Sequence, residues 1–124
     1  IRLHSYESLG TFDGPGLRLV VFLQGCNFRC RYCANPDTID PKGECREVSM
    51  EEILEMAVSE KPFFGKRGGV TFSGGEPTFQ AKALVPLVKR LHEHGDHDRH
   101  GHGGNQLCHG HLTQDATLFL LHMV

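Results

Sequence analysis

The sequence predicts an α/β fold in which parallel strands alternate with helices. Residues 17–23 form an almost continuous apolar run rich in branched side chains, residues 69–73 are expected to form a second strand, and each ends where glycine and polar residues begin. Runs of this length and composition are typical of parallel strands that are buried on both faces. Between them, Ser49 and Glu52 have the spacing of a capping box at the start of a helix. A strand–helix–strand unit is therefore expected over residues 17–73.

The segment before the first strand is predicted to be irregular for most of its length. Residues 1–6 are expected to form a short extended lead-in. Residues 8–16 hold three glycines and a proline, a composition typical of a loop rather than of a helix or strand.

Two helices are expected. The first should cover about residues 50–59, where apolar side chains recur on one face, and a basic connection should follow at 61–67. The second lies within residues 79–94, and Pro86 indicates either that it begins near residue 83 or that it is kinked, because proline lacks the amide hydrogen. Gly95 suits the end of this helix.

Composition excludes several classes of protein. With 124 residues the chain is one domain at most, and a net charge of −2 gives no indication of a polybasic nucleic-acid binder. No apolar run approaches the ~20 residues that a membrane span requires. Of the five cysteines, three are clustered in the pattern of a metal site, which favours a reducing, cytoplasmic location over disulfide bonds.

The three clustered cysteines are the strongest chemical signal in the sequence. Cys26, Cys30 and Cys33 lie on one short segment directly after the first predicted strand. Thiolates this close can bind one soft metal centre, and a cubane [4Fe–4S] cluster held by three cysteines leaves one iron without a protein ligand. An open iron can bind a small molecule, whereas a fourth protein thiolate would close the site for electron transfer.

The spacing Cys-x3-Cys-x2-Cys, with Tyr32 just before the last cysteine, resembles the cluster loop of the radical S-adenosylmethionine (SAM) superfamily. Three flanking segments narrow the resemblance to the pyruvate formate-lyase activating enzyme family: residues 10–18 (GTFDGPGLR), 35–38 (NPDT) and 68–77 (GGVTFSGGEP). The resemblance extends from about Ile1 to Gly95.

The resemblance implies a fold, an activity and partners. The fold would be the N-terminal part of a partial (βα)6 TIM-like radical SAM barrel, with the 8–16 loop across the barrel mouth. The activity would be that of an oxidoreductase of anaerobic metabolism, which reductively cleaves SAM at a [4Fe–4S] cluster. The resulting 5′-deoxyadenosyl radical would take hydrogen from a glycine of a glycyl radical enzyme such as pyruvate formate-lyase, and a flavodoxin- or ferredoxin-type protein would donate the electron.

The resemblance also assigns site residues. Cys26, Cys30 and Cys33 would be the metal ligands, with no catalytic residue beyond them. The SAM contacts come from two further segments: Tyr32, Ala34, Gly74, Gly75 and Glu76. Many relatives carry histidine where this chain has Ala34, so only a backbone contact is expected from it.

Simpler interpretations of the SAM-contacting residues stay open. Tyr32 could instead shield the cluster from water, and Gly74 and Gly75 could simply form a tight turn. Missing side chains would, however, let backbone groups approach a ligand closely, and Glu76 supplies charge for the SAM ammonium group.

Other functions remain as alternatives. A different radical SAM enzyme acting on a small molecule would share the cysteines, although the 10–18 and 35–38 segments favour the activating enzymes. A non-catalytic metal-binding module is the alternative from another class. In that case Cys45 could complete a four-thiolate zinc site with the three clustered cysteines, although no second Cys-x2-Cys accompanies it.

The composition changes after Gly95, which divides the chain into a radical SAM core at 1–95 and a tail at 96–124. The tail holds six of the nine histidines, and no strand or helix start is evident in it before Thr117. It could be a metal-binding tract around Cys108, His109 and His111, a disordered segment, or a segment read out of frame. Back-translated and read one base later, residues 96–104 permit Ile-Thr-Thr-Ala-Thr-Asp-Thr-Gly-Gly, close to the continuation that the resemblance implies. A one-base frameshift near codon 95 is therefore the favoured hypothesis, and the chain is expected to be an incomplete fragment.

Overall fold

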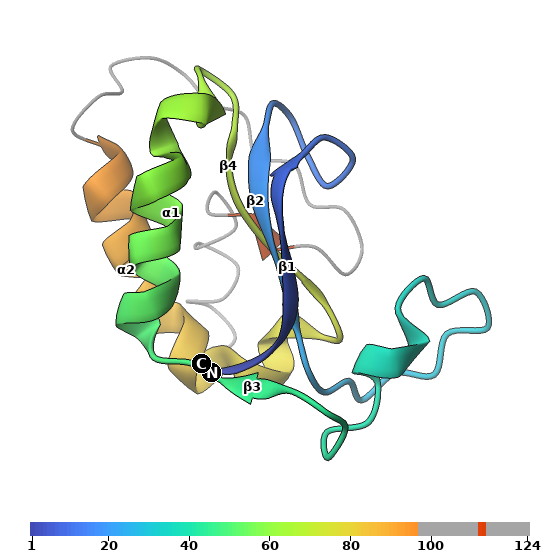
Figure 1. Ribbon diagram of the computed structural model, residues 1–124. Coiled ribbons are helices and arrows are strands. Elements are labelled where there is room, and N and C mark those ends of the chain that lie inside the picture. The colour runs from blue at the N-terminus through green and yellow to red at the C-terminus, as the bar shows by residue number, and fades with distance from the viewer. Residues whose placement is uncertain (97–111, 114–124) are drawn as a thin grey trace.

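A five-stranded sheet with two helices on one face forms the described part of the chain (Figure 1). The computed structural model describes residues 1–96 and 112–113. The strand order is β3-β1-β2-β4-β5, and only the pair β2–β4 is parallel. The elements in chain order are β1 (Arg2–Gly10), β2 (Arg18–Leu23), the 3-10 helix η1 (Pro36–Thr38), β3 (Arg46–Glu47), α1 (Met50–Phe64), β4 (Gly69–Gly74), the 3-10 helix η2 (Pro77–Gln80), α2 (Ala81–Asp96) and β5 (Leu112–Thr113).

The predicted strand–helix–strand unit is confirmed as β2–α1–β4. The two strands pair in parallel from Arg18 opposite Gly69 to Leu23 opposite Gly74. Ser49 begins α1 as predicted, because its hydroxyl accepts a hydrogen bond from the Glu52 amide at 3.1 Å. Alternate side chains of both strands pack with the two helices in one apolar core, which includes Leu19, Val21, Leu23, Ile53, Ala57, Val70, Phe72, Leu84, Leu87 and Val88.

The lead-in is longer and more regular than the sequence indicated. Residues 2–10 form the strand β1, which runs antiparallel to β2 and pairs with β3 on its other side. The ladder with β2 is interrupted between Leu3 and Ser5 and again between Glu7 and Gly10. These irregularities, together with a mostly exposed surface, remove the alternation of apolar and polar residues by which a strand is recognised in sequence.

The loop between β1 and β2 lies at the end of the sheet opposite the cysteines. Gly16 packs against the start of β4, where an added Cβ would come within 2.5 Å of the Gly68 nitrogen. The Thr71 hydroxyl donates a hydrogen bond to the Asp13 carbonyl at 2.9 Å. The buried Arg18 side chain donates to the carbonyls of Pro15 at 3.0 Å and Val70 at 3.1 Å. The expectation of a loop across the cluster end of the fold is therefore wrong.

Both helices extend beyond their predicted ends. The first helix runs to Phe64 and includes Pro62, so most of the expected 61–67 connection is helical. The burial of Phe64 against the core favours this last turn and offsets the backbone hydrogen bond that Pro62 cannot donate. The second helix begins at Ala81, two residues before the position indicated for a late start, and contains Pro86.

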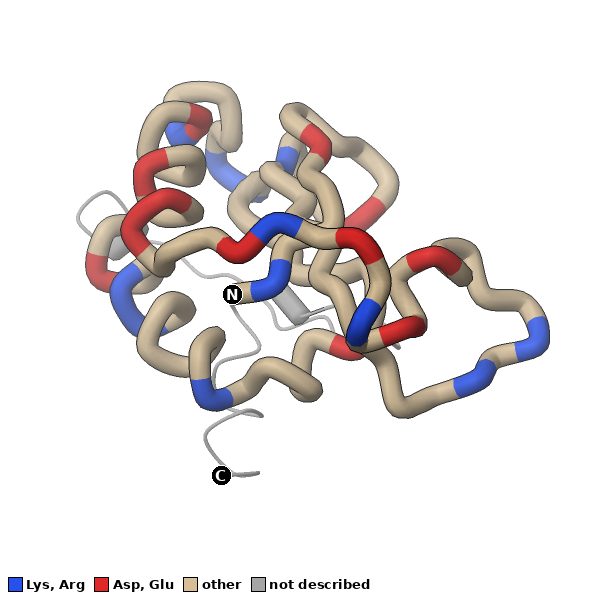
Figure 2. Tube along the Cα trace, turned by 60° about the horizontal axis from the view of Figure 1, so that its bottom comes forward, with Lys and Arg blue, Asp and Glu red and all other residues tan. Residues whose placement is uncertain are grey.

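The described residues show an open sheet, so the α/β class is confirmed while a closed barrel is not seen. A fifth strand at Leu112–Thr113 pairs antiparallel with β4, earlier in the tail than the predicted start near Thr117. Basic and acidic residues are interspersed along the described chain and do not gather by sign (Figure 2). Within residues 1–96 and 112–113, no helix has the length and apolar character that crossing a membrane would require.

Candidate metal centre

The cysteine loop and the Gly-Gly-Glu segment leave the sheet side by side. Leu23 ends β2 and pairs with Gly74, which ends β4. Just beyond the strands, the Gly75 amide donates to the Leu23 carbonyl at 2.8 Å, and the Glu76 amide donates to the Gly25 carbonyl at 3.0 Å. Both motifs therefore lie at the carboxyl ends of neighbouring parallel strands, where α/β folds place their sites.

Three glycines allow these two segments to touch. Gly25 and Gly74 have φ angles of 109° and 88°, in the left-handed region that favours glycine. A Cβ on Gly75 would lie 2.2 Å from the Gly25 carbonyl oxygen, and one on Gly74 would lie 2.6 Å from the Leu23 nitrogen. The glycine pair thus has a packing role, the close approach of the two strand ends, in addition to the ligand contact proposed for it.

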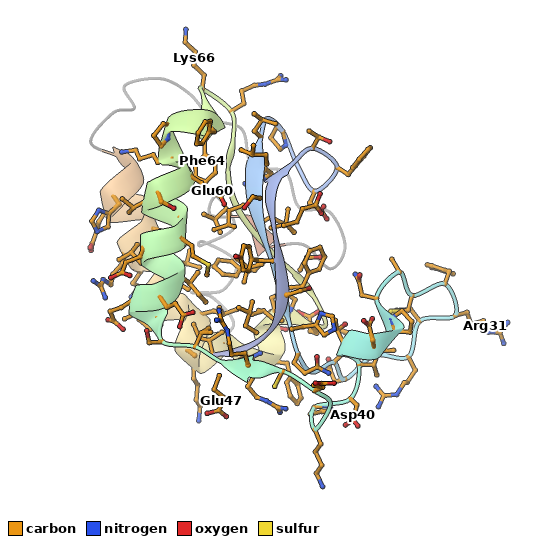
Figure 3. The ribbon with its side chains drawn as sticks, in the orientation of Figure 1. Arg31, Asp40, Glu47, Glu60, Phe64 and Lys66 are labelled. Carbon is orange, nitrogen blue, oxygen red and sulfur yellow. The ribbon has the colours of Figure 1, made fainter. Side chains whose placement is uncertain are left out.

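The cysteine loop is joined to the fold at its base. The Gly25 amide donates to the Thr38 carbonyl at 2.8 Å, and the Cys26 amide donates to the Ile39 carbonyl at 3.1 Å. These hydrogen bonds hold the chain that returns from the loop, at Thr38 and Ile39, beside the residues where the loop begins. The enclosed segment projects from the sheet, with Arg31 at its tip pointing away from the molecule (Figure 3).

Above its base, the loop forms hydrogen bonds only within itself among the described residues. Cys26 and Cys33 are half-buried and Cys30 is exposed, and all three are free thiols. The hydrogen bonds of residues 27–34 stay within the loop: the Phe28 amide donates to Cys26 Sγ at 3.4 Å, and the Arg29 side chain donates to the carbonyls of Cys26 and Phe28. The segment can therefore change shape around a ligand without breaking a hydrogen bond to the rest of the described fold.

The three sulfur atoms are not gathered in this conformation. Among residues 1–96 and 112–113, no three His, Cys, Asp or Glu side chains are arranged to hold a metal ion. The donor set nevertheless fits a [4Fe–4S] cluster, because three thiols follow one another on an accessible loop and a backbone amide already donates to one of the sulfurs. Hydrogen bonds to cluster sulfurs are among the features that set cluster potentials.

Tyr32 and Ala34 are both exposed on the loop. The Tyr32 side chain is 92% accessible, so it shields nothing in the described structure. It is free to contact either a cluster or a ligand, and the two interpretations of this residue remain open.

Glu76 lies half-buried at the beginning of η2 and has one oxygen occupied. Its Oε1 accepts hydrogen bonds from the Thr78 amide at 3.0 Å and from the Thr78 hydroxyl at 2.6 Å. No hydrogen bond to Oε2 is found within the described part of the chain, so this oxygen is the one that could accept from a ligand. The carboxylate therefore caps a helix and also presents an acceptor beside the cysteine loop.

Cys45 is engaged elsewhere. It lies just before β3, and its sulfur accepts a hydrogen bond from the Arg2 side chain at 3.4 Å. It belongs to no group of three metal ligands among the described residues. The histidines and Cys108 of the tail lie outside the described residues. The hypotheses about the tail therefore concern residues that the structure does not describe.

One glutamine at the loop base was missed by sequence reasoning. The sequence indicates Gln24 only as the end of a strand, yet its side chain donates hydrogen bonds to two carbonyls of the chain that returns from the loop. The one signal that could have drawn attention to Gln24 is its position, a polar residue between the apolar residues 19–23 and the glycine before the first cysteine.

Comparison with known proteins supports the same centre. The pyruvate formate-lyase-activating enzyme of Clostridium pasteurianum is 48% identical over 106 residues, which cover 82% of this chain and 44% of that protein. The enzyme of the same name from Staphylococcus aureus strain USA300 is 51% identical over 96 residues, covering 77% of this chain and 38% of the relative. The chain thus spans less than half the length of the curated relatives it matches.

The family match covers most of the chain and contains every cysteine of the loop. Residues 12–111 match the model of the 4Fe-4S single cluster domain. A single cluster agrees with one set of three clustered cysteines and with the short connection of residues 38–46, which has no room for a second cluster domain. The chain belongs to the 4Fe-4S single cluster domain family.

Proposed function

We propose that the chain is the N-terminal part of a glycyl-radical-enzyme activase of the pyruvate formate-lyase activating type, an oxidoreductase that uses a [4Fe–4S] cluster and SAM. One observation carries the proposal. The Glu76 amide donates a hydrogen bond at 3.0 Å to the carbonyl of Gly25, the residue directly before Cys26. This bond couples the cluster-binding loop to the Gly-Gly-Glu segment. A three-cysteine loop beside a carboxylate suits a ligand that binds iron at one end and carries an amino group there that can donate to the carboxylate.

In this proposal Cys26, Cys30 and Cys33 hold the cluster and leave one iron open. SAM would occupy that position through its amino and carboxylate groups. Gly74, Gly75 and Glu76 would contact the methionyl part of SAM, with Glu76 Oε2 accepting a hydrogen bond from its amino group. Tyr32 and the backbone of Ala34 would contact the adenine, which the exposure of both residues allows.

The bound cluster and SAM would supply the redox chemistry, namely one-electron cleavage of the sulfonium to methionine and a 5′-deoxyadenosyl radical. The protein's own part is to orient SAM, to exclude water and to present the site to a glycine of the partner. The proposed partner is a glycyl radical enzyme related to pyruvate formate-lyase, and the proposed electron donor is a flavodoxin or ferredoxin. We place the protein in the cytoplasm because reduced, clustered thiols persist there.

Anaerobic reconstitution of the full chain with iron and sulfide tests the cluster assignment. We expect a brown protein that holds about four iron atoms per chain and shows charge-transfer absorption. Replacing Cys26, Cys30 or Cys33 by serine should abolish most of the iron uptake. Cys45→Ser is the matched control and should retain it, because Cys45 is hydrogen-bonded to Arg2 and takes no part in the proposed site.

Reductive cleavage of SAM tests the activity. Formation of 5′-deoxyadenosine with dithionite would support the enzyme, and a glycine-centred radical in a co-incubated pyruvate formate-lyase would identify the partner class. A colourless, zinc-loaded protein, or an equal loss of metal in Cys45→Ser, would favour the non-catalytic metal-binding module. Cleavage of SAM with no transfer to the partner would favour a radical SAM enzyme that acts on a small molecule.

A further inference from the structure

Gln24 connects the two ends of the cysteine loop through its side chain. It is fully buried at the carboxyl end of β2, two residues before Cys26. Its Nε2 donates to the Asp37 carbonyl at 3.0 Å and to the Asp40 carbonyl at 2.7 Å. Both carbonyls belong to the chain that returns from the loop, so one amide group joins the residues that precede the thiols to those that follow them.

The fold can orient the three thiols only through the loop base, because residues 27–34 form hydrogen bonds only within the loop. The base has few other links. They are the backbone hydrogen bonds from the Gly25 and Cys26 amides to the returning chain, the hydrogen bonds that Glu76 and Gln80 donate to the carbonyls of Gly25 and Gln24, and a partly exposed contact of 3.1 Å between His4 Nε2 and Asp37 Oδ2. Compared with the other side-chain links at the loop base, the hydrogen bonds of Gln24 come from a fully buried side chain.

The chemistry of the Gln24 amide argues against a role in stability alone. Its Oε1 is buried and has no hydrogen-bond partner among the described residues. A buried acceptor without a partner destabilises the folded state, and an apolar side chain of the same length would avoid that cost. The carbonyl of Asp40 also accepts from the Gly43 amide at 2.9 Å and so would keep one partner without Gln24.

We propose that Gln24 is a positioning residue for the cluster. Its Nε2 holds the two ends of the loop together and thereby fixes the backbone positions before Cys26 and after Cys33. The inference rests on the proposed cluster site. Gln24 would act through the backbone of the loop, since its amide is directed at the two carbonyls. Fixing the ends of the loop lowers the conformational entropy that the thiols lose when they converge on iron.

A neighbouring glutamine provides a matched control. Gln80, the last residue of η2, forms a paired contact with the backbone of Arg2: Oε1 accepts from the Arg2 amide at 2.8 Å, and Nε2 donates to the Arg2 carbonyl at 3.0 Å. Nε2 also donates to the Gln24 carbonyl at 3.1 Å. Gln80 therefore joins β1 and β2 to the Gly-Gly-Glu segment without touching the returning part of the loop.

The test compares Gln24→Met with Gln80→Met in the full chain, since methionine keeps the length of glutamine and removes the amide. After anaerobic reconstitution, an iron chelator is added and the loss of cluster absorbance is followed. We expect Gln24→Met to lose its cluster about tenfold faster than the wild type, and Gln80→Met to stay within about twofold. In the cluster-free proteins, the amides of Gly25 and Cys26 should exchange hydrogen faster in Gln24→Met alone.

Gly43→Ala is a second variant that leaves the buried glutamine in place. A Cβ on Gly43 would lie 2.5 Å from Gln24 Nε2, so the added methyl group should displace the amide and accelerate cluster loss. This variant decides the matter if Gln24→Met fails to fold. Unchanged cluster loss in Gly43→Ala and in a folded Gln24→Met, or equal acceleration in Gln80→Met, would overturn the role of Gln24. A wild-type chain that takes up no iron would instead refute the cluster site itself.

Discussion

Gly75 marks the point where the two candidate motifs touch, and it leaves no room for a side chain. A Cβ added to Gly75 would lie 2.2 Å from the Gly25 carbonyl oxygen. Because that oxygen belongs to the backbone, no side-chain rotation can relieve the clash. We therefore expect Gly75→Ala to lower the free energy of unfolding by roughly 1–3 kcal/mol, as overpacking does. Urea denaturation followed by circular dichroism measures this difference.

Gly65→Ala separates this clash from the cost of an unfavourable backbone conformation. Gly65 has a φ of 57° and a ψ of −147°, a backbone conformation that is essentially restricted to glycine, and a Cβ added there would have no atom within 4 Å, so alanine should bear the backbone cost alone, about 1–3 kcal/mol. Equal stability of Gly75→Ala and the wild type would show that the two strand ends can separate freely. The close contact between the motifs would then not constrain the site.

The cysteines and the glycine pair of the candidate site could be predicted because their spacing along the chain carries the signal. Gln24 could not, since its role depends on carbonyls of Asp37 and Asp40, which fold back from a later part of the chain. The packing of Gly75 on Gly25 was missed for the same reason. Contacts between distant segments leave no periodic mark in the sequence.

At the level of elements, the buried parallel pair was the most predictable part of the fold. Strand β2 carries nearly continuous apolar side chains, β4 runs into the Gly-Gly-Glu motif, and α1 begins at a capping box, so each has a local signal. The strand β1 lacked one because it is interrupted and mostly exposed. The end of α1 was missed because the burial of Phe64 outweighs the effect of Pro62, a balance that only tertiary packing decides.

The contact between the two helices gives a prediction of pH dependence. Arg90 Nη1 on α2 lies 2.8 Å from Glu51 Oε1 in the first turn of α1. The pKa of Glu51 is lowered, first by a backbone hydrogen bond at the helix N-terminus and then by Arg90. A lowered pKa in the folded state stabilises the fold above the ordinary carboxylate pKa, and this stabilisation is lost as the pH falls through the lowered value.

We expect Glu51→Gln to lower the melting temperature slightly at neutral pH and to leave it unchanged at a pH below the lowered pKa. The effect should be small, because the carboxylate is exposed and solvent screens it. Glu55→Gln, an exposed position on the same helix without an ion pair among the described residues, is the control. A difference between Glu51→Gln and the wild type that persists in acid would contradict the assignment to the charged pair.

On the scale of the whole molecule, the described fold is one layer of helices on one face of an open sheet (Figure 1). Val20 lies between core residues Leu19 and Val21, so it faces away from the helices, yet it is fully buried. A central parallel strand that is apolar on both faces is typical of folds covered on both sides. The burial of Val20 is therefore consistent with the partial barrel that the sequence resemblance implies.

A shifted reading frame would account for the change of composition after Gly95. Histidine and aspartate codons both end in a pyrimidine and differ only in their first base. When a run of such codons is read one base later, it encodes a different set of amino acids. We predict that a single inserted or deleted base near codon 95 restores Ile-Thr-Thr-Ala-Thr-Asp-Thr-Gly-Gly in place of residues 96–104. Sequencing the gene across codons 90–124 checks this directly. If no single-base change restores that segment, the histidines belong to the protein, and metal binding by residues 108–111 becomes the hypothesis to test with the cysteine loop blocked.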